Sequence, residues 1–292
     1  MIKKRKPFVA LLLAIVPGLG QIYNGQLLKG SLFLLFDIFI PILFGLSGVL
    51  LHISGLAIMV LIGIAFLIYR SIDAFSSAKK LQVYELKPYN KWYYYLLFTI
   101  MMVILRTFLD APLSTGIKTF KAKSPSMLPL VEPGDWFVAD LNAYSKNRIE
   151  YGDVVLFMTT KGEIWTHRVI GLPLDSIEMV DGVVFINGRP NEIQEKRKYV
   201  SDGKEVIELE EKLTSIKRIK ILEFKNFDYP ETRTLEKQMI PENEYFLLGD
   251  NRDNSYDSRF IGTIKRQDII GKAIYTYWGK TTGRININLR AE

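Results

Sequence analysis

Four strongly apolar segments near the N-terminus constrain this chain more than any other feature of its sequence. Segments two, three and four cover residues 31–50, 53–69 and 93–109, and each can cross a bilayer as an α-helix. Segment one, residues 8–23, is interrupted by a Pro-Gly pair and is short for a span. The sequence therefore predicts a helical membrane module in the first third of the chain.

Basic residues around these segments predict the orientation of the module. Lys and Arg cluster at residues 3–6 and again in the polar linker 70–92, and such clusters favour the cytoplasmic side of a membrane. An even number of crossings must separate them, so segments two and three form a hairpin while segment one does not cross. Segment four then crosses outward and places the chain after Asp110 outside the cytoplasm. Asp37, in segment two, is either an acid that faces the helix bundle or a functional acid at membrane depth.

Short β-prone runs separated by Asp-Gly, Asn-Gly and Pro-Gly turns dominate the chain from residue 117 onward, which is typical of a mainly β domain. The stretch 190–240 is rich in Lys and Glu and indicates an insertion or subdomain, with one possible helix near residues 208–219. The expected fold class is thus N-terminal transmembrane α-helices followed by a mainly β extracytoplasmic domain. Its expected parts are a membrane module with a basic linker at 1–91, a transmembrane anchor at 92–112 and the β-rich domain at 113–292.

Composition excludes some chemistry and narrows the partners. The chain has no cysteine, so neither a disulfide nor a thiolate nucleophile is available. A net charge of +7 is compatible with nucleic-acid binding. Much of the basic charge, however, flanks the apolar segments, where it matches topology signals and affinity for anionic lipid. We therefore expect the lipid bilayer, and no nucleic acid, as a partner.

A proline-bracketed serine turn, Ser-Pro-Ser-Met-Leu-Pro at residues 124–129, begins the polar region. Two prolines restrict the backbone, and a rigid turn can present the Ser126 hydroxyl at a fixed angle. The Ser124 hydroxyl could then help the Ser126 backbone N–H to bind an oxyanion. The alternative is an ordinary Ser/Pro loop at the entrance to a domain.

A serine nucleophile also needs a base and a group that orients the base. His167 is the only histidine after residue 110, and its ordinary pKa lies near neutrality. A lone histidine in a strand can equally be a packing residue. The polar loop 249–262 carries Asp250 and Asp257, either of which could orient His167. The loop lacks the ligand spacing of an EF-hand, and we expect neither a metal nor a cofactor.

Four blocks together resemble type I signal peptidase, the S26 family of serine peptidases. They are Ser-x-Ser-Met-x-Pro, Tyr-Gly-Asp-Val-Val, Arg-Val-Ile-Gly-Leu-Pro and Gly-Asp-Asn-x-x-x-Ser-x-Asp-Ser-Arg-x-x-Gly, in this order over residues 124–262. The resemblance covers roughly residues 113–280. It implies a membrane-bound serine endopeptidase that cleaves N-terminal signal peptides from exported preproteins after small residues at −1 and −3.

The resemblance also implies roles for individual residues. Ser126 is the implied nucleophile and Ser124 the oxyanion donor. Asp257 and Arg259 are implied to hold the site together, with Ser255 near the base. We expect a bacterial cell-membrane enzyme with several spans and an extracytoplasmic catalytic domain. Its expected partners are preprotein signal peptides, the bilayer and a secretion translocon.

One departure from the family pattern affects the mechanism. The usual bacterial base is a lysine directly before the arginine of the Arg-Val-Ile-Gly block, and here that position is His167. This is similar to the endoplasmic-reticulum and archaeal branch, in which a histidine is the base. A Ser–His pair favours an acid at the other imidazole nitrogen, and Asp257 is the first candidate, with Asp250 the second. Smaller departures are Pro125 and Leu174, each at a position where glycine is common.

The family implies that the substrate binds as an added strand, and the segment 117–124 is the expected sheet edge. The main alternative of another class is a non-enzymatic membrane scaffold or binding protein with a degenerate peptidase domain. Histidine is itself a competent base, and the serine and acid motifs are intact, which favours the enzyme.

Overall fold

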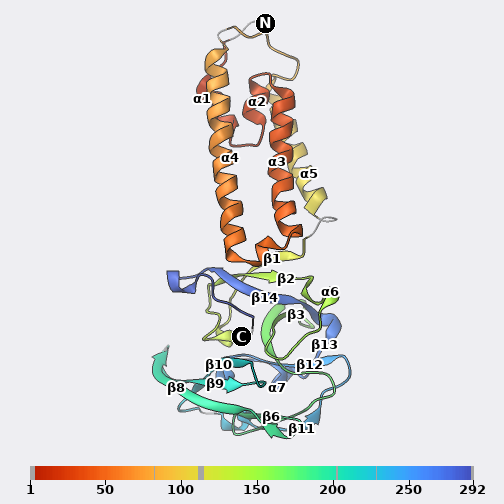
Figure 1. Ribbon diagram of the computed structural model, residues 1–292, viewed down its shortest axis with the longest axis vertical. Coiled ribbons are helices and arrows are strands. Elements are labelled where there is room, and N and C mark those ends of the chain that lie inside the picture. The colour runs from red at the N-terminus through yellow and green to blue at the C-terminus, as the bar shows by residue number, and fades with distance from the viewer. Residues whose placement is uncertain (1–3, 82, 111–114, 202, 228, 291–292) are drawn as a thin grey trace. The chain divides into compact units, whose positions relative to one another are not determined.

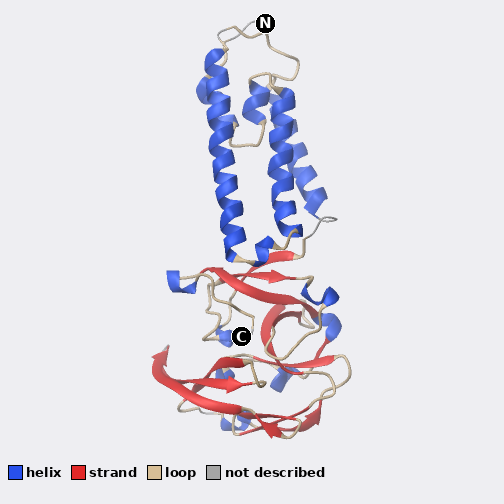
Figure 2. Cartoon of the chain, in the orientation of Figure 1, coloured by secondary structure: helices blue, strands red, loops and turns tan. Residues whose placement is uncertain are grey.

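The computed structural model describes residues 4–81, 83–110, 115–201, 203–227 and 229–290. The chain forms two compact units, residues 1–115 and 116–292 (Figure 1). Helices build the first unit, and strands dominate the second (Figure 2). The expected fold class is therefore confirmed. The expected boundary between residues 112 and 113 lies outside the described residues.

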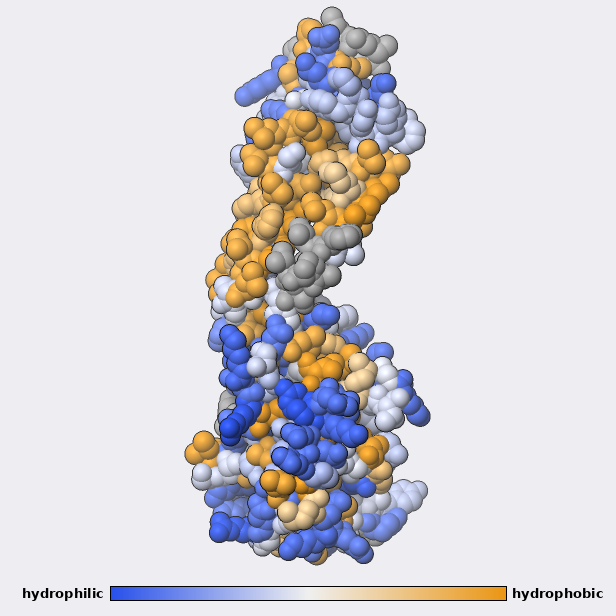
Figure 3. Space-filling view, turned by 90° about the vertical axis from the view of Figure 1, so that its right-hand side faces the viewer, coloured by the Kyte–Doolittle hydropathy of each residue, from blue (hydrophilic) through white to orange (hydrophobic). Residues whose placement is uncertain are grey.

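The helical unit contains two long helices, two short ones and one of intermediate apolar length. Their bounds are α1 (Pro7–Leu13), α2 (Leu19–Tyr23), α3 (Leu27–Leu46), α4 (Ile53–Lys80) and α5 (Trp92–Asp110), with a 3₁₀ turn η1 (Val49–Leu51). By length and composition, α3 and α4 could cross a membrane, whereas the apolar part of α5 is shorter, at 92–105. Apolar side chains cover much of this unit's surface in Figure 3. That surface suits a lipid environment better than water.

Segment one forms α1 and α2, which are separated by a tight turn. Gly18 has a φ of 77°, and a Cβ on it would collide with the backbone of Gly30. A residue with a side chain would therefore separate α2 from α3 at this point. The break after α1 agrees with the expectation that segment one is not a continuous span.

Polar side chains inside the helical unit are paired with one another. The Arg70 guanidinium lies 3.3 Å from the Asp37 carboxylate and donates to the Ile15 carbonyl at 2.9 Å. Lys29 and Asp73 form a second ion pair at 2.6 Å. Asp37 thus faces the helix bundle, which was one of the two alternatives for it.

A seven-stranded antiparallel sheet forms the centre of the second unit, in the order β1-β2-β14-β3-β4-β12-β13. The bounds of its strands are β1 (Ile117–Lys121), β2 (Trp136–Asp140), β3 (Val154–Met158), β4 (Ile164–Gly171), β12 (Glu244–Leu248), β13 (Ile264–Lys265) and β14 (Ile269–Trp278). β1 pairs with β2 on one side and is an edge strand of this sheet. An edge strand is therefore present over residues 117–121 of the expected edge at 117–124.

Two smaller sheets complete the unit. One has the order β11-β5-β6-β7, with β5 (Ser176–Val180), β6 (Val183–Ile186), β7 (Arg189–Pro190) and β11 (Leu235–Met239). The other has the order β10-β9-β8, with β8 (Glu192–Ser201), β9 (Lys204–Lys212) and β10 (Arg218–Phe224). The possible helix at 208–219 was wrong, because this stretch covers the end of β9, a turn and the start of β10. The short helices are α6 (Ala143–Lys146) and α7 (Ser258–Ile261).

Candidate active site

The serine turn is a short 3₁₀ helix, η2 (Pro125–Met127), which is held from two directions. Met127 is buried and packs with core residues that include Phe137 and Leu156. On the other side, the Asn251 backbone N–H donates to the Ser126 carbonyl at 2.9 Å, and the Asn251 amide donates to the Pro125 carbonyl at 3.1 Å. Ser126 itself is 8% exposed. Its backbone is therefore fixed by both the core and the loop 249–254.

Ser124 is the N-cap of this turn. Its hydroxyl accepts a hydrogen bond from the Ser126 backbone N–H at 3.2 Å. The two groups expected to bind an oxyanion are thus adjacent and bonded to each other. An oxyanion could reach both donors only after the Ser124 side chain turns away from this N–H.

His167 lies in β4, opposite Val155 of β3, and is 3% exposed. The aromatic rings of Phe157 and Trp165 lie 5.5 and 6.2 Å from the imidazole, measured between ring centroids. Burial lowers the pKa of His167 to about 4, although the Asp257 charge opposes this shift. The imidazole is therefore neutral at neutral pH, which is the state that a general base requires.

The imidazole has one polar neighbour within hydrogen-bond range among the described residues. Nε2 lies 3.5 Å from the Ser255 hydroxyl, at the limit of a hydrogen bond, and Nδ1 is buried without a partner in the part of the chain that is described. Gly249 permits this arrangement, because a Cβ on Gly249 would collide with the Ser255 side chain and the Ser126 carbonyl. Ser255 thus lies beside His167.

Asp257 is fully buried but does not hydrogen-bond to His167. Its carboxylate accepts from Arg259 Nε at 2.8 Å, from Arg259 Nη2 at 2.9 Å and from the Gly249 backbone N–H at 3.0 Å. Burial raises the pKa of Asp257, but the hydrogen bonds and charge of Arg259 outweigh it and hold the pKa below its ordinary value. Asp257 is therefore ionised and acts on His167 through its charge.

Asp250, the second candidate, is occupied elsewhere. Arg168 donates to it from Nε at 2.7 Å and from Nη2 at 2.6 Å, and both side chains are almost fully buried. The expected hydrogen bond from the imidazole N–H to Asp257 or Asp250 is thus absent among the described residues. In each case a nearby arginine binds the carboxylate in a bidentate manner, and neither carboxylate is hydrogen-bonded to His167.

One cavity brings the serine and the histidine together. It has a volume of about 780 Å³, and Ser124, Ser126 and His167 all line it. Residues 119–123, from the end of β1 and the two residues after it, line another part, and Trp165 and Tyr256 also contribute. The Ser126 hydroxyl makes no hydrogen bond to His167 among the described residues, and such contacts are often long before substrate binds. The described residues contain no group of three or more His, Cys, Asp or Glu side chains that could hold a metal ion.

Residues 89–278 match the sequence pattern of the family described as signal peptidase, peptidase S26. The chain belongs to this family. The match begins just before α5 and ends with β14, so it includes the serine turn, β4 and the loop 249–262. The expected enzyme class, signal peptidase I, is confirmed.

Individual relatives have the same assignment. The chain is 30% identical to a signal peptidase I from Leptolyngbya laminosa over 184 residues, which is 58% of this chain and 75% of that protein. It is 27% identical to signal peptidase IB from Staphylococcus aureus (strain MRSA252) over 172 residues, or 59% of this chain and 83% of that protein. A crystal structure of a signal peptidase I from Enterococcus faecalis V583 matches at 24% identity, with a TM-score of 0.26, over 43% of this chain and 97% of that chain.

Four residues that the sequence did not single out surround Ser126 and His167 in the structure. Asn251 braces the serine turn, Gly249 lets Ser255 approach, and Phe157 with Trp165 encloses the imidazole. Gly249 and Asn251 belong to the Gly-Asp-Asn block, and Trp165 lies two residues before His167, so on the same face of β4. Phe157 carried no such signal, because β3 reaches His167 only through sheet pairing.

Proposed function

We propose that this signal peptidase is a serine endopeptidase in which Ser126 is the nucleophile and His167 the general base. It cleaves N-terminal signal peptides from exported preproteins after small residues at −1 and −3. The observation that carries the proposal is that Ser126 and His167 line one cavity in which burial keeps the imidazole neutral. Among the described residues, Lys121 at the end of β1 and Lys123 just after it are the lysines that line this cavity.

The reaction follows from this pair. The Ser126 hydroxyl attacks the scissile carbonyl and gives its proton to the imidazole. The imidazolium then protonates the leaving amine of the mature chain, and an acyl-enzyme remains on Ser126. Water, deprotonated by the same imidazole, releases the signal peptide and regenerates the hydroxyl. The Asp257 carboxylate stabilises the imidazolium through its charge, and the Ser255 hydroxyl holds the ring orientation.

The oxyanion is bound by the Ser126 N–H and the Ser124 hydroxyl. Because Ser124 now accepts from that N–H, its side chain rotates when substrate binds. The rotation frees the N–H and turns the hydroxyl toward the developing charge. Both donors then stabilise the oxyanion of the transition state more than they stabilise the carbonyl oxygen of the ground state.

The substrate pairs with β1 as an added strand. β1 is an edge strand, and residues 119–123, from its end and the two residues after it, line the cavity that Ser126 also lines. Main-chain hydrogen bonds then bind the peptide, and alternate side chains enter the cavity. Phe120, Val131 and Phe137 line apolar parts of the cavity, which suits the small side chains at −1 and −3.

We place the enzyme in the bacterial cell membrane as a protein with several spans. Residues 1–91 are the membrane module with its basic linker, 92–112 the anchor, and 113–292 the extracytoplasmic catalytic domain with an insertion at 190–240. The hairpin of α3 and α4 supports this arrangement, because both helices are long and apolar enough to cross. The bilayer and a secretion translocon are its partners in addition to the preproteins.

The test is cleavage of a preprotein by the purified full-length protein in detergent micelles. Wild-type protein is expected to release a mature chain whose new N-terminus, read by mass spectrometry, follows a small residue. Ser126→Ala is expected to release none, and Ser215→Ala, which changes an exposed serine that does not line the cavity, is expected to match the wild type. A wild-type protein that binds the preprotein without cleaving it would instead support the scaffold.

A further inference from the structure

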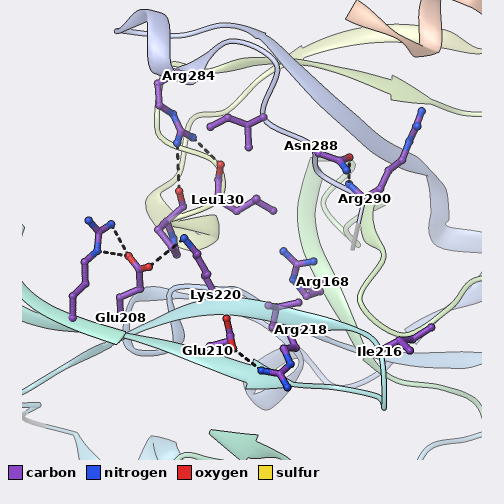
Figure 4. A pocket seen from close by; sticks show the side chains of 14 residues that line it. Leu130, Arg168, Glu208, Glu210, Ile216, Arg218, Lys220, Arg284, Asn288 and Arg290 are labelled. Atoms are coloured by element: carbon purple, nitrogen blue, oxygen red, sulfur yellow. Dashed lines mark hydrogen bonds and ion pairs between the residues drawn. The ribbon is translucent and has the colours of Figure 1, made fainter. Parts of the chain in front are cut away.

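A second cavity in the β unit is lined by six basic side chains among its fourteen residues, with Glu208 and Glu210 as its acids. It has a volume of about 680 Å³ and lies between the β10-β9-β8 sheet, the loop at residues 129–130 and the C-terminal segment 284–290 (Figure 4). We call it the basic cleft. The basic residues that line it are Arg168, Arg197, Arg218, Lys220, Arg284 and Arg290.

Two of these arginines are held in place by buried carboxylates. The side chains of Arg168 and Arg284 are 4% and 12% exposed, and buried carboxylates bind them, Asp250 at 2.6 Å and Asp135 at 2.5 Å. Arg284 also donates to the Leu130 carbonyl at 2.7 Å. They form a fixed floor that does not depend on a ligand.

The wall formed by the three-stranded sheet is different, because its cations are exposed and share their partners. Glu208 lies 2.6 Å from Arg197 and 3.5 Å from Lys220. Glu210 lies 3.0 Å from Arg218 and 3.1 Å from Lys196. Each glutamate is thus shared by two cations in the described structure.

The sharing leaves positive charge on this wall. The side chains of Arg197, Arg218 and Lys220 are 64%, 57% and 64% exposed, and exposed ion pairs are weak. Arg218 and Lys220 can therefore leave the shared glutamates for a carboxylate of a ligand at little cost. Arginine is well suited to this exchange, because its planar fork binds a carboxylate through two hydrogen bonds.

The cleft begins close to the nucleophile but is separate from the cavity that holds it. Pro129 and Leu130 follow Ser126 by three and four residues, which limits the Cα separation to about 11–15 Å. Successive side chains of a strand face opposite ways, so Arg168 of β4 faces the basic cleft while His167 faces the catalytic cavity. Since this separation is an upper limit, a peptide that extends from Ser126 toward the rim at about 3.3 Å per residue needs at most roughly three to five residues to reach it.

We propose that the basic cleft binds acidic side chains in the mature segment of the substrate, a few residues after the scissile bond. The inference rests on the proposed function, because it takes a peptide held at Ser126 as its starting point. It assigns a substrate class: preproteins whose mature chain begins with several Asp or Glu residues. A peptide is favoured over a lipid headgroup because the loop that carries the nucleophile also forms the rim of the cleft.

The test compares two preprotein peptides with the same signal peptide and cleavage site. Their third to sixth mature residues are Asp and Glu in one and Asn and Gln in the other. For the full-length wild-type protein in micelles, kcat/KM is expected to be about five-fold higher for the acidic peptide at low ionic strength, with the difference lost in high salt. Arg218→Gln with Lys220→Gln is expected to bring the ratio to about one and to leave cleavage of the neutral peptide unchanged.

This double variant leaves each shared glutamate with another cation, Glu208 with Arg197 and Glu210 with Lys196, so no carboxylate is stranded. The matched control is Lys212→Gln with Lys225→Gln, which removes two ion pairs outside the cleft, one at the end of β9 and one directly after β10. The control is expected to retain the wild-type preference.

The outcomes separate the two proposals. Equal wild-type rates for both peptides, with Ser126-dependent cleavage, would overturn the inference and leave the proposed function intact. If neither peptide is cleaved, the proposed function fails. The inference is then tested by binding, measured as the fluorescence anisotropy of a labelled acidic mature-segment peptide with the Ser126→Ala protein. If Arg218→Gln with Lys220→Gln does not weaken the binding of this acidic peptide, the inference is overturned. If the variant instead loses binding to vesicles of anionic lipid with its peptide preference unchanged, the cleft serves a membrane surface and the inference is wrong.

Discussion

The burial of His167 makes a quantitative prediction about the pH dependence of cleavage. The acid limb of kcat/KM should have its midpoint near pH 4, since burial lowers the pKa of His167 to about 4. With that pKa, about 99% of the imidazole is neutral at pH 6, against about 24% for an ordinary histidine with a pKa of 6.5. The value of kcat/KM at pH 6 should thus nearly equal that at pH 8 rather than fall to about a quarter of it.

The same shift affects stability, with a defined sign. The unfolded chain binds a proton at His167 near pH 6.5 and the folded chain only near pH 4, so the folded state loses stability as pH falls between these values. A shift of this size corresponds to about 3 kcal/mol. The assay must therefore confirm, by intrinsic fluorescence and by recovery of activity at pH 7, that the protein remains folded at each acidic point.

Initial rates with a fluorogenic peptide well below KM would give the profile. Two variants test the contributions of neighbouring charges to this pKa, because Asp257 raises the pKa of His167 and Arg259 lowers it. Asp257→Asn should move the acid limb to lower pH, and Arg259→Gln should move it to higher pH. A wild-type midpoint at 6.5 or above would refute the reasoning from burial. A rate that still rises well above pH 9 would point to a lysine base.

Three further predictions concern substitutions at Leu174, Arg168 and Ser124. Leu174→Gly should raise the free energy of unfolding by about 0.5–1 kcal/mol in denaturant titrations, because Leu174 has a φ of 70°. Arg168→Met should cost about 3–5 kcal/mol by leaving Asp250 buried and unpaired, and adding Asp250→Leu should recover part of that loss in thermal melts. Ser124→Ala should lower kcat about 100-fold in single-turnover assays with little change in KM. A rise in KM of about 100-fold with kcat unchanged would contradict an oxyanion role.

Local patterns in the sequence were sufficient to predict most of the architecture. The contrast between apolar segments and turn-rich β runs indicated the two classes of unit, and the paired prolines indicated the rigid serine turn. The stretch 208–219 was misassigned because its glutamates suit an exposed helix face as well as a strand. Pairing with β8 and β10 decides the outcome, and such pairing is not visible in a short window.

The site was harder to predict where tertiary contacts compete. Asp257 is near His167 in space, but Arg259 is two residues away in sequence and takes both carboxylate oxygens. Similarly, the charge of Asp250 suggested that it orients His167, but Asp250 forms an ion pair with the buried Arg168. Leu174 shows the converse: a turn that favours glycine keeps its left-handed backbone although a leucine occupies it. Sequence patterns identify which groups take part, and the packed structure decides which of them bond.

The most direct measurement of the central claim is kcat/KM for one preprotein with wild type, His167→Ala and His167→Lys. If His167 is the base, the alanine variant should lose at least about 1,000-fold, because removing one member of such a unit removes most of its catalysis. The lysine variant should recover only part of that loss, since the pocket must also bury a neutral amine. A His167→Ala protein that cleaves at the wild-type rate, while Ser126→Ala remains inactive, would contradict the account.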